Sequence, residues 1–119
     1  MGTLSLVVIR CRDLEHSRLF YERLGLDFVR HRHGAGAEHL ACEKGALVFE
    51  LYPRRSENDD TTAVRLGFRV RALAELIADL ERVGVPLLSP FAESPWGRRA
   101  VVADPDGHTV ELIEATEGP

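Results

Sequence analysis

Two glutamates lie in stretches that otherwise have the pattern of buried β-strands. Glu111 stands between Val110 and Leu112 in TVELIE, and Glu50 occupies a matching place in ALVFELYP. An ionised carboxylate taken out of water needs a cation, a metal ion or a set of hydrogen-bond donors. Each glutamate is therefore expected either on a wet face of its sheet or in a functional site.

The strands and helix that position each of these glutamates belong to a sequence pattern that occurs twice in the chain. Residues 9–26 align with residues 68–85 without a gap, and both stretches read as the end of a strand followed by a helix. One strand precedes each helix and three follow it, so each half is predicted to be a βαβββ module. The strands are expected at residues 4–11, 26–32, 38–43 and 46–53, and at 63–70, 86–94, 98–104 and 109–114.

The two helices differ at their first residue. Asp13 is predicted to cap the first helix and Gly25 to end it, whereas the second helix has Ala72 in place of the capping residue and ends at Gly84. Both carry an apolar stripe that predicts a face turned to the core. The stripes are Leu14, Leu19, Phe20 and Leu24 in the first helix, and Leu73, Leu76, Ile77, Leu80 and Val83 in the second.

Length and composition favour one compact domain. The chain has 119 residues, of which 45% are hydrophobic. We expect a single domain over residues 1–119, with a first module at about 1–55, a polar linker at about 56–62 and a second module at about 63–119. The linker reads SENDDTT and is rich in turn-forming residues.

Charge and cysteine content exclude several classes of partner. The formal net charge is −4 and the basic residues form no long block, so nucleic acid is not an expected partner. No apolar run approaches the roughly 20 residues that cross a bilayer, and we expect no export signal and no membrane partner. Cys11 and Cys42 have no metal-ligand spacing, which indicates two reduced thiols in a cytoplasmic protein.

Strand alternation places the charged residues on one side of the sheets. Leu66, Phe68 and Val70 form one set on their strand, while Arg65 belongs to the other set. The apolar sets should pack under the helices. Arg65, Glu50 and Glu111 are therefore expected together on the opposite, concave face.

Three stretches carry a resemblance to a known family. DLEHSRLFYERLGL, LGFRVRALAEL and above all PWGRRAVVADPDGHTVELIE resemble the vicinal oxygen chelate superfamily, the group of glyoxalases, bleomycin resistance proteins and extradiol dioxygenases. The resemblance covers nearly the whole chain. It implies an α+β fold in which two βαβββ modules form a cupped mixed sheet around a small molecule. It also implies a homodimer.

The resemblance also implies where a metal ion would bind. Metal-using members carry a ligand, usually histidine, on the first strand of each module, and many carry a glutamate on the last. The late positions match as Glu50 and Glu111, but the early positions are Leu6 and Arg65. Leucine cannot ligate and arginine keeps its proton, so we expect no metal and no other cofactor. Arg65 is expected to act as the counter-charge for Glu111, Glu50 or both, the alternative being a purely structural salt bridge.

The histidines offer weaker candidates for chemistry. His39 opens a strand on which it shares a face with Ala41, and it is the histidine most suited to ligand contact. His31 and His33 have a spacing that can chelate, but flanking arginines disfavour a metal ion there. His16 is expected to be solvated, and His108 to be a solvated tip or to make a turn hydrogen bond at the DPDG turn.

Aromatic residues complete the expected ligand site. Trp96, beside Gly97, is a candidate wall for a ligand or else a lid on the sheet edge, while Tyr52 and Phe91 are weaker candidates at the rim. One of the adjacent arginines Arg98 and Arg99 is expected to face the cup. The predicted ligand-binding set is Leu6, Val8, His39, Glu50, Tyr52, Arg65, Trp96 and Glu111.

These expectations favour a binding protein that holds a small, partly apolar molecule without metal, for example to sequester an antibiotic or a toxic metabolite. Two enzymatic alternatives stay open. One is a metal-dependent lyase, isomerase or dioxygenase whose ligands have moved to His39, Glu50 and Glu111. The other is a metal-free acid–base enzyme that uses Glu50 or Glu111 as its catalytic residue.

Overall fold

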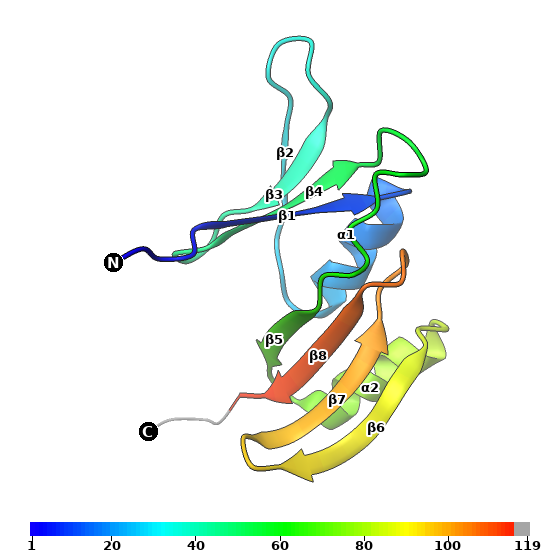
Figure 1. The fold of residues 1–119 in the computed structure, drawn as a ribbon. Helices are drawn as coiled ribbons and strands as arrows, with labels where there is room; N and C mark the ends of the chain where they lie inside the picture. The colour runs from blue at the N-terminus through cyan, green and yellow to red at the C-terminus, as the bar shows by residue number, and fades with distance from the viewer. Residues whose placement is uncertain (116–119) are drawn as a thin grey trace. The chain divides into compact units, whose positions relative to one another are not determined.

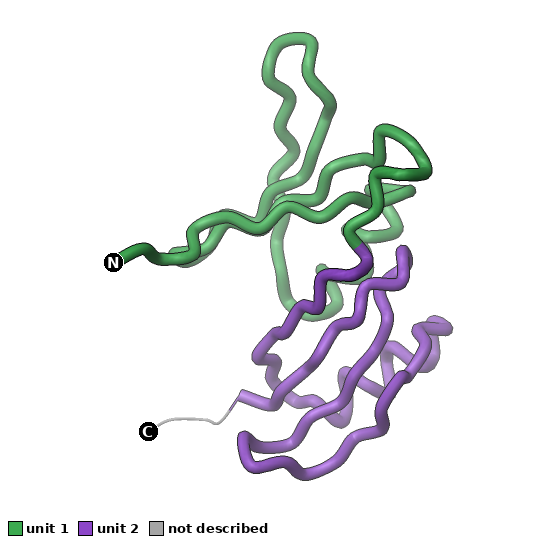
Figure 2. Tube along the Cα trace, viewed as in Figure 1, with its two compact units in different colours: residues 1–61 green, residues 62–119 purple. Residues whose placement is uncertain are grey.

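Each half of the chain folds as one βαβββ module. The computed structural model describes residues 1–115, and the last four residues of the expected second module, 116–119, lie outside the described part. The chain divides into two compact units, residues 1–61 and residues 62–119, which are coloured separately in Figure 2. The predicted α+β class and the two modules are confirmed, and the strands are hydrogen-bonded as two four-stranded sheets, one in each module (Figure 1).

The first module consists of β1 (Leu6–Cys11), α1 (Leu14–Arg23), β2 (Val29–His31), β3 (His39–Cys42) and β4 (Val48–Pro53). Its sheet has the order β1-β4-β3-β2. β1 runs parallel to β4, and β3 runs antiparallel to both β4 and β2. This order puts the last strand of the module in the middle of the sheet, so Glu50 faces side chains from two neighbouring strands.

The second module repeats this arrangement with β5 (Leu66–Val70), α2 (Leu73–Arg82), β6 (Leu87–Ser94), β7 (Gly97–Ala103) and β8 (Thr109–Glu114). The sheet order is β5-β8-β7-β6, with β5 parallel to β8 and the other pairs antiparallel. β8 is the counterpart of β4. Glu111 on β8 therefore takes the same central place in its sheet as Glu50 does in the other.

Alternation along the strands separates a core face from an open face in each sheet, the open face being the one that carries the glutamate. Ile9, Cys11 and Leu51 are fully buried on the side of the first sheet that α1 covers, and Val110 and Leu112 are fully buried in the second module. The open faces, with Glu50 and Glu111, are more exposed. The two glutamates therefore lie on the wetter side of each sheet.

The first helix begins at the predicted cap, but the predicted burial of two helix residues is wrong. The Asp13 carboxylate accepts hydrogen bonds from the backbone N–H groups of Glu15 and His16, which confirms the predicted cap. Leu19 is 50% exposed and Val83 is 48% exposed, although both were expected in the core. The buried stripe of α1 instead runs through Ser17, Phe20, Tyr21 and Leu24, at the helical spacing of three and four residues.

α2 begins without a side-chain cap of its own. Ala72 adopts a left-handed conformation with φ 49°. Its methyl side chain has no oxygen that could accept a cap hydrogen bond. The Glu114 carboxylate, from the end of β8, accepts the backbone N–H of Leu73 at 2.9 Å instead. An acidic group at a helix N-terminus is favoured by both the free N–H groups and the helix dipole.

Candidate functional site

Glu111 lies at the centre of a charged cluster on the open face of the second module. Its Oε1 accepts a hydrogen bond from Nε of Arg99 at 3.1 Å and lies 2.9 Å from Nη2 of the same arginine in an ion pair. Its Oε2 accepts one from Nη2 of Arg65 at 3.1 Å. Each carboxylate oxygen is thus taken by a different guanidinium, and the three side chains together carry one net positive charge. The expected pairing of Arg65 with Glu111 is observed.

The register of the strands explains how these side chains meet. Gly67 on β5 is the direct partner of Glu111, and Arg65 lies two residues before Gly67 on the same face. Arg99 on β7 is the partner of Ile113, which is two residues from Glu111 on β8. Side chains from three adjacent elements therefore converge on one carboxylate. Arg99 is the arginine of the Arg98–Arg99 pair that lies on this face.

A shallow depression adjoins the cluster. Its volume is about 320 Å³, and it is lined by Gly67, Phe68, Arg69, Glu111 and Ile113. Gly67 has no side chain to cover the sheet beside Glu111, and a Cβ added there would come no closer than 4.0 Å to the backbone oxygen of Glu111. The glycine thus leaves room for a flat group, with an arginine and a carboxylate at its edge and an apolar floor.

The open face of the first module holds a second group of predicted residues. His39 is 3% exposed, and its Nε2 lies 3.5 Å from the Oε2 of Glu50. The ring of Tyr52 stacks on that of His39, with the centroids 4.2 Å apart and the planes 7° apart. The guanidinium of Arg10 lies 5.0 Å from the centroid of Tyr52. The structure therefore brings His39, Glu50 and Tyr52 together.

Leu6, Val8 and Trp96 are the remaining residues of the predicted ligand-binding set. Leu6 is 50% exposed and Val8 half-buried, both on the open face of β1 next to Val48 and Glu50 of β4. Trp96 lies in the turn between β6 and β7 and is 74% exposed, which is high for a tryptophan. Its large indole surface is free to cover a bound molecule.

Glu111 and the first-strand positions do not fit the metal ion that the family resemblance implies. Leu6 has no donor atom, and Arg65 places a fixed positive charge beside the carboxylate. Both oxygens of Glu111 already accept N–H groups from guanidinium ions. An ion at Glu111 would have to displace two arginines, so the cluster as it stands does not support chemistry through that ion.

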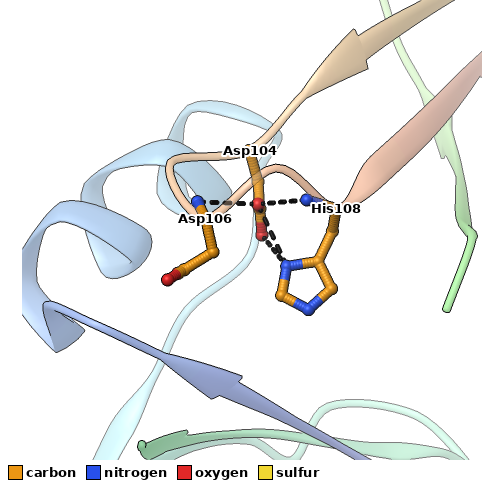
Figure 3. Close-up of side chains that lie close together, drawn as sticks. All are labelled: Asp104, Asp106 and His108. Carbon is orange, nitrogen blue, oxygen red and sulfur yellow. Dashed lines mark hydrogen bonds and ion pairs between the residues drawn. The ribbon is translucent and has the colours of Figure 1, made fainter. Parts of the chain in front are cut away.

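The DPDG turn forms a self-contained cluster (Figure 3). Oδ1 of Asp104 accepts the backbone N–H groups of Asp106, Gly107 and His108, and Nδ1 of His108 lies 2.9 Å from Oδ2. His108 is fully buried, so the predicted turn hydrogen bond is confirmed and the solvated alternative is wrong. The side chains of Asp104, Asp106 and His108 lie close enough for a metal ion, but the Asp104 carboxylate is taken up by the turn.

Two features of these faces are not evident in the sequence. One is Gly67, which has the pattern of an ordinary strand residue. The other is the position of His31 and His33, whose rings both lie within 6 Å of the ring of His39. The cross-strand pairing of His31 with His39 depends on the register of the hairpin, which side-chain types alone do not fix. His16 is 71% exposed on α1, as expected.

Comparisons with known proteins agree with the resemblance. The family model described as the Glyoxalase/Bleomycin resistance protein/Dioxygenase superfamily matches residues 3–112. No curated protein matches the chain significantly. Neither helix of the described residues 1–115 has the length and apolar character needed to cross a membrane.

Solved structures with the same fold include proteins of several kinds. TnmS3, an antibiotic-binding protein from Streptomyces sp. CB03234, is 26% identical, with a TM-score of 0.73 and 98% coverage of both chains. A glyoxalase-related enzyme from Fulvimarina pelagi is 27% identical, with a TM-score of 0.69 and coverage of 97% of this chain and 89% of its own. An integron cassette protein from V. cholerae is 23% identical, with a TM-score of 0.72 and coverage of 98% and 97%, and shows the fold alone.

Proposed function

Because the chain belongs to the Glyoxalase/Bleomycin resistance protein/Dioxygenase superfamily, we propose that it is a small-molecule-binding protein that sequesters an antibiotic or a toxic metabolite. The observation that carries the proposal is the Arg65–Glu111–Arg99 cluster. Where metal-using relatives hold an ion, this chain has a guanidinium. Hydrogen bonds from arginine orient a ligand but do not supply the Lewis acid that the metal-dependent chemistry needs.

The surroundings of the cluster suit a flat and partly polar ligand. The depression at Gly67 has an apolar floor, and Arg69 at its edge is an exposed cation on the same face. Trp96, in the same module as the cluster, provides exposed aromatic surface for stacking. The proposed ligand-binding set is therefore the expected one, Leu6, Val8, His39, Glu50, Tyr52, Arg65, Trp96 and Glu111, with Arg99 added. The antibiotic-binding relative TnmS3, similar over its whole length, supports this role.

Location and assembly form part of the same proposal. Cys11 and Cys42 are both buried, and two buried cysteines without metal-ligand spacing suit the reducing cytoplasm. β6 is an edge strand that exposes Leu87, Leu88 and Phe91, and apolar surface of this kind suits a homodimer. Light scattering on the purified chain measures the assembly directly, and a mass of one chain would contradict the dimer.

A fluorescence titration tests the binding proposal. The chain has one tryptophan, Trp96, and its 74% exposure means that a ligand covering it shifts the emission to shorter wavelength. Bleomycin and a panel of aromatic antibiotics are titrated in buffer containing EDTA. At least one is expected to give a saturable shift and to raise the melting temperature. Chemical conversion of the bound compound would instead favour the acid–base alternative, and a panel with no saturable binding would contradict the proposal.

A further inference from the structure

Three histidines converge on the open face of the β2–β3 hairpin. His31 on β2 is the direct cross-strand partner of His39 on β3. His33 follows His31 by two residues. The ring centroids are 6.0 Å apart for His31 and His33, 5.7 Å for His31 and His39, and 5.6 Å for His33 and His39. The three rings therefore form a nearly equilateral triangle.

This triangle is slightly larger than one tetrahedral metal ion requires, and the rings of His31 and His33, whose planes are only 9° apart, must turn before they can share an ion. A zinc–nitrogen bond of about 2 Å puts each imidazole centroid roughly 3 Å from the ion, so the centroids of two ligating rings are about 5 Å apart. The observed separations of 5.6 to 6.0 Å are close to that value. His33 is exposed and His31 half-buried, so the side-chain torsions of both residues have room to change.

A carboxylate stands where a fourth ligand belongs. Oε2 of Glu50 lies 3.5 Å from Nε2 of His39, and two ligand atoms on one tetrahedral zinc ion are separated by roughly 3.3 Å. Nδ1 of His39 is 3.4 Å from the carbonyl oxygen of Ala37. An Nδ1–H group that donates to this carbonyl leaves the Nε2 lone pair directed toward Glu50. A backbone partner of this kind commonly orients a metal-ligating histidine.

His31 has a similar orienting partner. Its Nε2 lies 3.0 Å from Oε1 of Glu43, in the loop after β3. A proton on Nε2 that is donated to this carboxylate leaves Nδ1 as the lone-pair atom. The ring of His39 is held in addition by stacking on Tyr52. His39 is thus positioned by its neighbours before any ion binds, whereas the rings of His31 and His33 have to turn toward the ion.

The arginines that flank the histidines do not oppose a cation at this place. Arg30 and Arg32 alternate with the histidines and so point to the other side of the hairpin. Arg30 forms ion pairs with Glu38 and Glu15, and Arg32 forms one with Glu38. Hydrogen bonds from Arg18 and from Arg30 hold the pKa of Glu15 below its usual value, so that carboxylate stays charged opposite Arg30. The positive charges are compensated on their own face.

We propose that His31, His33 and His39, with Glu50 as the fourth ligand, bind one divalent transition-metal ion of the zinc, cobalt and nickel class. Imidazole donors select these ions over magnesium and calcium, which prefer oxygen ligands. The site lies within the first module and does not use Leu6 or Arg65. Four protein ligands leave no open position, so the ion fastens the hairpin to the central strand β4 as a structural clamp.

A cobalt titration of the full, untagged chain tests this site. Co²⁺ is expected to bind with one ion per chain and to give the visible absorption of tetrahedral coordination, and Zn²⁺ is expected to displace it. The substitution His33→Gln should weaken Co²⁺ binding at least about tenfold. His16→Gln is the matched control, because His16 is 71% exposed on α1. Melting curves without metal show whether each variant is folded; since His33 is exposed, its replacement should not alter them.

Two results would overturn the proposal. One is the absence of saturable Co²⁺ binding to the unaltered chain. The other is unchanged affinity in His33→Gln and in His31→Gln, which would place the ion elsewhere. The titration contains no organic ligand, so its outcome is independent of the proposed antibiotic or metabolite binding.

Discussion

The Glu111→Gln substitution probes the charged cluster of the second module directly. Glutamine keeps the shape of the side chain but is uncharged, and it places an NH₂ group at one of the two positions where Arg65 and Arg99 each find a carboxylate oxygen. Ion pairs near the surface contribute about 0.2 to 1 kcal/mol each. The pair with Arg99, which is 32% exposed and contacts the carboxylate through both Nε and Nη2, should lie near the upper end, and the pair with Arg65, which is 55% exposed, near the lower end. The expected loss of unfolding free energy is about 1 kcal/mol.

Urea unfolding followed by far-ultraviolet circular dichroism measures this loss. Arg99→Gln should lower the unfolding free energy more than Arg65→Gln does, because Arg99 is better buried and closer to the carboxylate. Glu93→Gln serves as the control, since Glu93 is 76% exposed in its pair with Arg98. An unchanged stability of Glu111→Gln, or a larger effect of Arg65→Gln than of Arg99→Gln, would refute the assigned contacts.

Three further substitutions test other parts of the structure. Asp104→Ala removes the acceptor for three backbone N–H groups and for His108, and should lower the unfolding free energy by about 3 kcal/mol in urea unfolding. Glu114→Ala removes the cap at Leu73 and should cost about 1 kcal/mol in the same assay, whereas no change would contradict the cap. Gly67→Leu fills the depression, and should abolish the ligand-induced rise in melting temperature while the unliganded protein melts within a few degrees of the parent.

Much of the fold was predictable from the sequence because the chain contains an internal repeat. Each half shows the same strand and helix periods, and strand alternation separates the core face from the open face. The Arg65–Glu111 contact followed from the same reasoning, since both residues fall on the open face of a repeat whose first and last strands pair.

The errors arise where position depends on tertiary packing. Leu19 and Val83 are apolar but lie beside the helix stripes that face the sheets, so they remain exposed. His108 follows a turn of polar sequence, yet its ring is fully buried, where it pairs with the carboxylate of Asp104. Hydrophobicity gives the direction of a stripe but not its width.

The histidine triangle shows a second kind of limit. His31 and His33 make a poor metal site when only their own neighbours in sequence are considered, and His39 lies on a separate strand. Only the hairpin register places His39 opposite His31, and so adds a third histidine to the pair His31 and His33. Registers of this kind depend on the length and geometry of the loop as well as on the hydrophobic pattern of the strands.

A Trp96 fluorescence titration with the antibiotic panel in EDTA, run on the unaltered chain and on Arg99→Gln, directly tests metal-free binding at the Arg65–Glu111–Arg99 cluster. We expect saturable binding that persists in EDTA and weakens about fivefold or more in the variant, because the cluster that orients the ligand has lost its best-placed guanidinium. Arg82→Gln, on the exposed side of α2, should bind as the parent does. The absence of binding in EDTA, or equal affinities of the parent and of Arg99→Gln, would contradict metal-free binding at the Arg65–Glu111–Arg99 cluster.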